Sequence, residues 1–177
     1  RSPATADRGV PGRPPPPAAL APLLGSQLER QGLNPANGPP LELAAEALRE
    51  RSQTLLEMAE RAHCFYEEYE AFDEDAAQKH LRAAATEPLA ALRAAFAALD
   101  DWTESSTQGV VEEVAGSLGL KLGKVAQPLR VALTGQAASP SIGTTLVLVG
   151  RQRTLARIDR ALEHIASSAN GSQLSAG

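Results

Sequence analysis

Apolar residues recur at helical spacing along most of the chain. Four leucines between residues 20 and 28 lie on one face of a helix, and Gly32 then suits a helix C-cap. After a loop rich in Pro, Gly and Asn, the same periodicity predicts a longer helix from about Leu41 to Phe65, with one apolar and one charged face. The first third of the chain is therefore predicted to form two helices joined by a polar loop.

Capping residues divide the rest of the chain into six further helices. Asp73 or Asp75 suits an N-cap, while Gly119 and Gly135 suit helix ends. The expected helices span residues 73–81, 86–99, 104–118, 123–133, 140–149 and 151–165.

Local signals compete in the segment 139–150. Ser139 followed by Pro140 suits a helix N-cap and first turn, and Gly150 suits the helix end. The β-branched residues between 144 and 149 would also suit a strand, but a lone strand would lack a partner, which favours helix. The predicted fold class is all-α: a helical bundle or cage of six to eight helices in one or two small subdomains.

Composition changes at both ends of the chain. Residues 1–19 are Pro-rich and are predicted to form a flexible linker, although such runs also bind aromatic-grooved modules. Residues 20–100 and 101–165 are predicted to be the first and second helical subdomains, followed by a small-polar, disordered tail at 166–177. Because the chain begins at Arg1 rather than Met, we expect a fragment of a longer protein.

The bulk composition favours a helical protein of the cytoplasm. The 177 residues are 43% hydrophobic and only 3% aromatic, which suits helices packed through small aliphatic side chains. A single cysteine, Cys64, forms no internal disulfide, and no apolar run reaches membrane-spanning length. We therefore expect a reducing compartment, no membrane contact and a monomer.

The net charge of −4 is unevenly distributed. Residues 1–41 carry four basic and two acidic residues, residues 42–116 six and seventeen, and residues 117–165 seven and two, giving +2, −11 and +5. A polyanion should approach the last segment and avoid the acidic cluster at 67–75. Charge alone leaves open that both are ordinary solvated helix faces.

No catalytic constellation is recognisable. His63 and Cys64 are adjacent, and adjacent residues on a helix point in different directions, so a thiol mechanism is disfavoured and a structural role is expected. Gly119, Gly123 and Lys124 lack the spacing of a phosphate-binding loop. An enzyme acting on a small molecule would need a convergent polar site that the sequence does not offer.

The stretch from Lys121 to Gly150 carries the most distinctive motifs. It contains Lys-Leu-Gly at 121–123, Gln-Pro-Leu-Arg at 127–130, Ala-Leu-Thr-Gly at 132–135 and Ser-Pro at 139–140. This series resembles the C-terminal anticodon-binding part of bacterial glutamyl-tRNA synthetases, where it recurs in the same order. The resemblance extends through Leu-Arg-Glu-Arg-Ser-Gln-Thr-Leu-Leu-Glu-Met at 48–58 and covers residues 20–165.

The resemblance implies that this chain binds the anticodon of tRNA(Glu). The His-x-Gly-His and Lys-Met-Ser-Lys-Ser motifs of the catalytic half are missing, so aminoacylation is not expected from this chain. ATP and Mg would belong to the absent catalytic domain, which is the second expected partner, and this chain would need no cofactor. The alternative is a helical protein-protein interaction module that keeps the fold without binding RNA.

The resemblance also implies the residues that read RNA. Arg51 falls where the family reads the third anticodon base, and cytosine offers O2 and N3 as acceptors where guanine offers N–H donors. Without the resemblance Arg51 would be an ordinary surface arginine. Further anticodon contacts are implied for Gln127, Arg130, Ser139, Pro140 and Ile142, and the basic charge adds Lys121, Lys124, Arg151 and Arg153 as candidate contacts to the RNA backbone.

One residue departs from the family pattern. Where the family often has Phe just after the position of Ile142, this chain has Gly143, so a stacking contact to a base is expected to be missing. Trp102 is the nearby aromatic, and it suits a core position at a helix break better than a base contact.

Overall fold

The computed structural model describes residues 15–174 and is entirely helical over that range. It contains nine α-helices and three short 3-10 helices, with no strand among these residues. The prediction of an all-α fold is confirmed. Most of the Pro-rich segment predicted as a linker, residues 1–14, lies outside the described residues. Within the described range, no helix is both long and apolar enough to cross a membrane.

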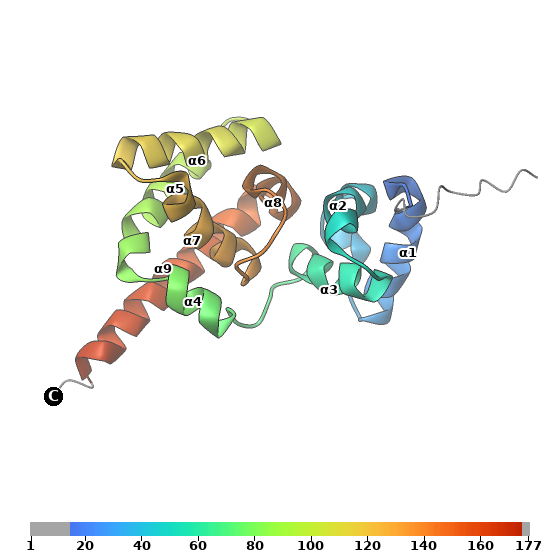
Figure 1. Cartoon of the computed structure of the whole chain (residues 1–177), viewed down its shortest axis with the longest axis horizontal. Helices are drawn as coiled ribbons and strands as arrows, with labels where there is room; N and C mark the ends of the chain where they lie inside the picture. Colours follow the sequence, from blue (N-terminus) through green and yellow to red (C-terminus); the bar gives the residue numbers. More distant parts are fainter. Residues whose placement is uncertain (1–14, 175–177) are drawn as a thin grey trace, which may run out of the picture.

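The first lobe consists of α1 (Pro17–Arg30), α2 (Leu41–Leu48) and α3 (Leu55–Tyr66), together with the 3-10 helices η1 (Pro35–Asn37) and η2 (Arg49–Arg51). It occupies one side of the molecule in Figure 1. Its core contains the fully buried side chains of Leu24, Leu28 and Ala59. The helix predicted from residue 20 begins three residues earlier, because proline is well suited to the first turn of a helix.

The single helix predicted from Leu41 to Phe65 is wrong: the chain forms two helices with a break at residues 52–54. The hydroxyl of Thr54 accepts a hydrogen bond from the Glu57 backbone N–H at 3.1 Å, and the Glu57 carboxylate accepts one from the Gln53 N–H at 3.1 Å. These bonds satisfy backbone donors at the start of α3, so a new helix begins there. The break accounts for the ninth helix.

The second lobe contains α4 (Glu74–His80), α5 (Thr86–Ala98), α6 (Glu104–Leu118), α7 (Leu122–Thr134), α8 (Ile142–Val149) and α9 (Arg151–Leu174), with η3 at Ala83–Ala85. The central helix α7 packs against α4, α6, α8 and α9. Helix α5 packs on α6 and α9, so the helices group on either side of the segment 67–73 and not about the predicted division at residue 100.

Two helix ends differ from the sequence-based prediction. The N-cap of α8 is Ser141, whose hydroxyl accepts from the Thr144 N–H, and not Ser139. Helix α9 continues through residues 166–174, which were predicted as a disordered tail, and ends at Leu174. Extending a helix that is already nucleated needs only one hydrogen bond per residue, so a polar segment can follow without burying apolar surface.

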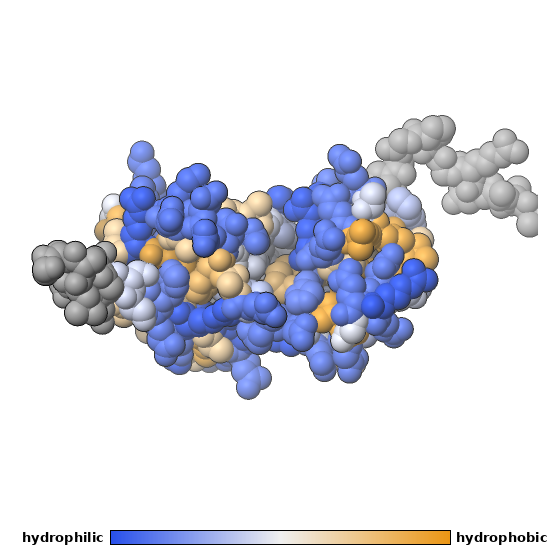
Figure 2. All heavy atoms as spheres, turned by 90° about the horizontal axis from the view of Figure 1, so that it is seen from below, coloured by the Kyte–Doolittle hydropathy of each residue, from blue (hydrophilic) through white to orange (hydrophobic). Residues whose placement is uncertain are grey.

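Figure 2 shows hydrophilic side chains over most of one face, with apolar side chains gathered in places on both lobes. On the first lobe, the exposed leucines are Leu23, Leu43 and Leu56.

Candidate nucleic-acid interface

A cleft of about 440 Å³ lies between the two lobes. On the first-lobe side it is lined by η2 and α3, including Arg51, and on the second-lobe side by the loop between α7 and α8, including Ser139 and Pro140. The fold thus brings to one cleft two parts of the chain that are distant in sequence.

Arg51 is presented by the break between α2 and α3. It is the last residue of η2, and its side chain is exposed to solvent. Within residues 15–174, no carboxylate lies within ion-pairing distance of its guanidinium. The capping bonds of Thr54 and Glu57 fix the backbone that follows Arg51. Arg51 is therefore an unneutralised cation at a defined position.

Arg130 approaches the same region from α7. Its Nε donates to the Ser139 hydroxyl at 2.8 Å, and that hydroxyl donates to the Pro140 carbonyl at 2.9 Å. The Ser139 and Thr145 hydroxyls are also 3.1 Å apart. Burial and, to a lesser degree, the positive charge of Arg51 lower the pKa of Arg130. Burial is the main cause, since a buried guanidinium loses the hydration that favours its charged form.

The cleft lining contains two arginines, Arg51 and Arg61, and two glutamates, Glu57 and Glu60. Of its carboxylates, Glu57 is paired with Arg61 at 3.0 Å, and Glu60 is exposed at the edge. Among the described residues, Arg51 and Arg130 have no carboxylate partner. An exposed guanidinium without a carboxylate partner has N–H donors free for a ligand rich in acceptors, so Arg51 suits a phosphate or the edge of a base.

Cys64 lies on the cleft wall, where burial favours its protonated thiol. Burial raises the pKa of its thiol to about 11, so at neutral pH the thiolate needed for nucleophilic attack is scarce. His63 lies next to it in the sequence and pairs with Glu67 at 3.4 Å instead. The arrangement agrees with the structural role that the sequence predicted for Cys64.

The side chains of Gln127 and Ile142 are less exposed to solvent than that of Arg51. Gln127 lies three residues before Arg130 on α7 and is partly buried, and its side-chain oxygen has no hydrogen-bond partner among the described residues. Ile142 is only 5% exposed and packs in the core, so its side chain does not face a ligand. At Ile142, only the backbone at the start of α8 remains available for a contact.

Lys121 and Lys124 are exposed at the other end of α7. The six residues from Lys124 to Arg130 correspond to about 9 Å along the helix axis. Lys124 also lies near the C-terminal end of α4: burial first, then the charges of Lys79, Lys124 and Arg82, lower the pKa of His80. Lys121 and Lys124 therefore form a second group of cations, at the end of α7 away from Arg130.

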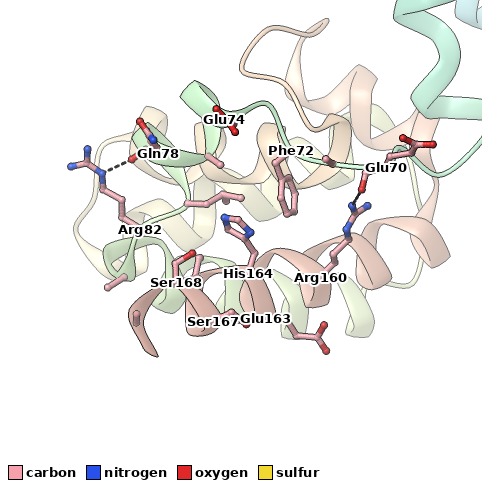
Figure 3. A pocket seen from close by; sticks show the side chains of 16 residues that line it. Glu70, Phe72, Glu74, Gln78, Arg82, Arg160, Glu163, His164, Ser167 and Ser168 are labelled. Atoms are coloured by element: carbon pink, nitrogen blue, oxygen red, sulfur yellow. Dashed lines mark hydrogen bonds between the residues drawn. The ribbon is translucent and has the colours of Figure 1, made fainter. Parts of the chain in front are cut away.

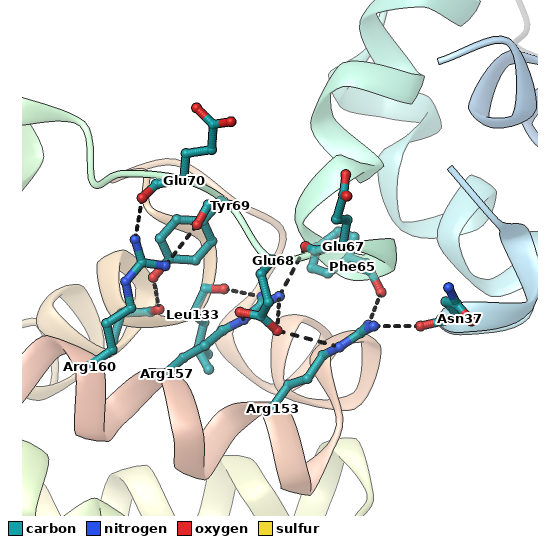
Figure 4. Close-up of polar contacts among 11 residues, drawn as sticks. Asn37, Phe65, Glu67, Glu68, Tyr69, Glu70, Leu133, Arg153, Arg157 and Arg160 are labelled. Carbon is teal, nitrogen blue, oxygen red and sulfur yellow. Dashed lines mark hydrogen bonds and ion pairs between the residues drawn. The ribbon is translucent and has the colours of Figure 1, made fainter. Parts of the chain in front are cut away.

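Arg151 and Arg153, predicted as RNA-backbone contacts, already bind within the protein. Arg151 donates to the Asp100 carbonyl at 3.3 Å, and its guanidinium carbon lies 5.5 Å from the centre of the Trp102 ring. Arg153 donates to the carbonyls of Phe65 at 2.6 Å and Asn37 at 2.7 Å (Figure 4). Both arginines thus have contacts within the protein, and their role as RNA-backbone contacts stays a prediction.

The predicted separation of basic and acidic segments does not hold in three dimensions. Glu68, from the acidic cluster, pairs with Arg153 at 3.8 Å and with Arg157 at 3.3 Å. Sequence reasoning missed Arg157 and Arg160, although Arg153, Arg157 and Arg160 follow the spacing of one helix face. That spacing was the available signal that the three arginines contact a common surface.

Gly143 has no room for the aromatic residue that the family often carries. A Cβ atom at this position would lie 2.9 Å from the backbone oxygen of Glu104 at the start of α6. Trp102 nearby is part of the core, as predicted: its indole N–H donates to the Leu146 carbonyl at 2.8 Å, and its ring lies 5.3 Å from that of Phe96. In this protein α6 and α8 therefore come close together at Gly143, where there is no side chain.

A second, larger cavity of about 890 Å³ lies between α4 and the last part of α9 (Figure 3). Phe72 and His164 meet there edge to face, with ring centres 5.0 Å apart. None of the predicted RNA-contacting residues lines this cavity. Among the described residues, no group of three or more His, Cys, Asp and Glu side chains is arranged to hold a metal.

Comparison with known proteins gives the family. A family model described as "Anticodon binding domain" matches residues 19–162. The fold resembles a glutamate tRNA ligase from Elizabethkingia meningosepticum CCUG26117, with a TM-score of 0.76, 22% identity, and coverage of 85% of this chain and 30% of that one. It also resembles a glutamate-tRNA synthetase from Elizabethkingia anophelis, with a TM-score of 0.70, 23% identity, and coverage of 84% and 29%.

The two kinds of match carry different weight. This chain spans less than a third of the length of either synthetase, and at this identity the likeness shows a common fold. The family model, in contrast, covers both lobes and the cleft between them. The chain belongs to the anticodon-binding domain family.

Proposed function

We propose that this chain binds the anticodon loop of tRNA(Glu) and supplies tRNA selection to a cytoplasmic glutamyl-tRNA synthetase. The observation that carries the proposal is the cleft that brings Arg51 together with Ser139, whose hydroxyl accepts a hydrogen bond from Arg130 behind the cleft lining. Neither arginine has a carboxylate partner within the described residues. Single-stranded RNA loops are recognised by splaying bases into such polar recesses and reading their edges.

In this proposal Arg51 reads the third anticodon base. Its exposed guanidinium donates to O2 and N3 of cytosine, whereas guanine places N–H donors on the corresponding edge and is rejected. Ser139, held by its hydrogen bond from Arg130, forms part of the opposite wall for a neighbouring base. The unpartnered side-chain oxygen of Gln127 accepts from a base N–H, and the start of α8, at Pro140 and Ile142, contributes backbone groups.

Lys121 and Lys124 are the proposed contacts to the RNA backbone. Both are exposed and lie along α7 from the cleft, so the strand that enters the cleft continues past them. Phosphate contacts of this kind position RNA without reading sequence. We assign Arg153 and Arg151 a role within the protein, where both donate to backbone carbonyl oxygens.

The proposed partners are tRNA(Glu) and the catalytic domain of the same synthetase. In that enzyme, the catalytic domain would bind ATP and Mg and ligate glutamate to the tRNA, while this chain acts as a monomeric unit without a cofactor of its own. The likeness to two glutamate-tRNA ligases supports this assignment.

A binding titration against two RNAs tests the proposal. Transcripts of tRNA(Glu) with C or G as the third anticodon base are titrated with the wild-type chain, with Arg51→Ala, and with the control Arg30→Ala, which removes an exposed arginine outside the cleft. The wild type and Arg30→Ala should prefer the RNA with C, and Arg51→Ala should lose most of that preference. The expected loss is on the order of 5- to 150-fold, from the 1–3 kcal/mol typical of a good base contact.

The titration also separates the competing function. Equal binding of both RNAs by the wild type would contradict discrimination of tRNA(Glu) by Arg51. The observation in favour of the alternative, a protein-protein interaction module, is the presence of exposed leucines on the first lobe. Leu23 is 50% exposed and Leu56 is 54% exposed. If neither RNA binds, and no affinity appears at low salt, the RNA-binding proposal fails and that alternative takes its place.

A further inference from the structure

Three arginines of α9 hold the segment that joins the two lobes. Arg153, Arg157 and Arg160 lie on one face of α9, and all three donate to backbone carbonyls between residues 65 and 70 (Figure 4). Helix α9 belongs to the second lobe, whereas residue 65 lies in the last helix of the first lobe. We call these three residues the arginine clamp.

Arg153 makes the direct connection to the first lobe. Its two terminal nitrogens donate separately to the Phe65 carbonyl at 2.6 Å, near the end of α3, and to the Asn37 carbonyl at 2.7 Å, in η1. A guanidinium is a rigid planar fork, so two such bonds fix both a distance and an orientation. Arg153 thereby joins α9 to two separate elements of the first lobe.

Arg157 and Arg160 fix the joining segment itself. Arg157 is 1% exposed, and it donates to the Leu133 carbonyl at 2.6 Å and to the Glu67 carbonyl at 3.3 Å. Arg160 donates to the Tyr69 carbonyl at 2.8 Å. The Tyr69 ring centre lies 5.3 Å from the Arg157 guanidinium carbon and 4.6 Å from that of Arg160, and its hydroxyl donates to the Ala132 carbonyl.

The clamp acts next to the candidate RNA cleft. Phe65 and Tyr69, which flank the clamped segment, also line the cleft between Arg51 and Ser139. Because Arg51 belongs to the first lobe and Ser139 to the second, the angle between the lobes sets their separation. The distance between these two groups therefore depends on bonds made on α9, away from the cleft mouth.

We propose that Arg153 is a positioning residue that fixes the two lobes relative to each other and thereby sets the width of the anticodon cleft. It acts through the carbonyls of Asn37 and Phe65 and does not touch the RNA. Loss of Arg153 then lowers selectivity for the third anticodon base, because Arg51 no longer lies at a fixed place. This last consequence rests on the proposed function, while the fixing of the lobes does not.

A distance measurement between the lobes tests the proposal without RNA. Spin labels are attached to cysteines placed at the exposed Glu46 on α2 and Glu112 on α6, in a Cys64→Ala background of the full chain. Arg153→Ala is compared with the matched control Arg151→Ala, which removes the same charge from the same helix but has its described contacts within the second lobe. Arg153→Ala should shift or broaden the distance distribution, and Arg151→Ala should leave it as in the wild type.

The conservative variant Arg153→Lys separates charge from geometry. A lysine keeps the positive charge but has no planar fork, so it should also broaden the distribution, while the salt dependence of RNA binding stays as in the wild type. The Arg153→Lys variant also allows the test to be made if Arg153→Ala does not fold. Unchanged distributions in both Arg153 variants would overturn the proposal.

RNA binding then tests the consequence. The preference for C over G should fall at least about threefold in the Arg153 variants, with a smaller change in affinity for the RNA as a whole. If instead both RNAs bind equally more weakly and the salt slope falls by about one, Arg153 is a phosphate contact and the positioning role is wrong. If the wild type binds neither RNA, the proposed function fails, and the distance measurement alone still decides whether Arg153 fixes the lobes.

Discussion

The Cys64 side chain shows how a residue's surroundings decide its chemistry. It lies on the wall of the cleft beside a histidine in the sequence, yet burial raises the pKa of its thiol to about 11 from an ordinary 9.0. The nearby charges of Arg157 and Arg153 act in the opposite direction and are outweighed. Burial, and not the neighbouring histidine, therefore sets the reactivity of this thiol.

We predict slow alkylation of Cys64 in the folded protein. At pH 8, raising the pKa of the thiol from 9.0 to about 11 lowers the thiolate fraction roughly a hundredfold. Iodoacetamide should thus modify the folded chain about a hundred times more slowly than the chain unfolded in urea, as followed by mass spectrometry. Equal rates in the two states would contradict the burial of the thiol.

The same raised pKa has a consequence for stability. Between pH 9 and about pH 11 the folded state keeps the thiol proton that the unfolded state releases, so the contribution of Cys64 to stability is complete below pH 9 and is lost as the pH rises. A Cys64→Ala variant should therefore show a shallower loss of stability over this range in urea unfolding. An unchanged slope would contradict the assignment.

At the scale of the helices, local signals identified most boundaries and missed those set by several residues together. Gly119 and Gly135 end α6 and α7 with φ of 66° and 76°, which is the left-handed conformation that marks a glycine C-cap in the sequence. The break before α3 was missed because apolar periodicity continues through it, although Thr54 and Glu57 have the spacing of a capping box. Periodicity alone does not distinguish one long helix from two that are nearly in phase.

The contact between α6 and α8 depends on a single glycine, which gives a prediction for the variant Gly143→Ala. The added methyl group would lie 2.9 Å from the Glu104 backbone oxygen, closer than carbon and oxygen atoms normally approach, so the two helices must move apart. The expected loss is about 1–3 kcal/mol of unfolding free energy, as is typical of overpacking, measured by urea unfolding.

Gly116→Ala on α6 is the matched control for this substitution. A Cβ at Gly116 would meet no atom within 4 Å, so alanine should stabilise the helix by roughly 0.5–1 kcal/mol through its higher helix propensity. If both variants gained stability, Gly143 would not be closely packed between α8 and α6, and this prediction would be wrong.

At the scale of the whole molecule, the candidate site was only partly predictable from the sequence. The resemblance to the synthetase family pointed to Arg51 and to Ser139, and the fold places both on one cleft. The role of Arg153 could not be predicted from charge, because its partners are backbone carbonyls of Asn37 and Phe65, which any sequence carries. Hydrogen bonds from a side chain to the backbone of a distant segment cannot be predicted from amino-acid composition.

The distribution of charge over the folded molecule gives the last prediction. Glu68 neutralises part of α9, whereas Lys121, Lys124, Lys79 and Arg82 have no carboxylate partner within the described residues. His80 reports on the last three of these cations, since burial and then the charges of Lys79, Lys124 and Arg82 lower its pKa. Phosphates bound at Lys124 would offset that positive charge, and the pKa of His80 would rise.

Titration of the His80 ring signals by NMR, with and without the anticodon stem-loop of tRNA(Glu), measures this shift. A higher pKa in the complex means that binding takes up a proton, so affinity should increase as the pH falls from the bound-state pKa towards the free-state pKa. In Lys124→Ala the pKa of His80 should be higher before RNA is added, and the change on binding should be smaller. If RNA binds in the cleft and the pKa of His80 stays the same, the RNA backbone does not pass along α7. Lys124 is then not a phosphate contact.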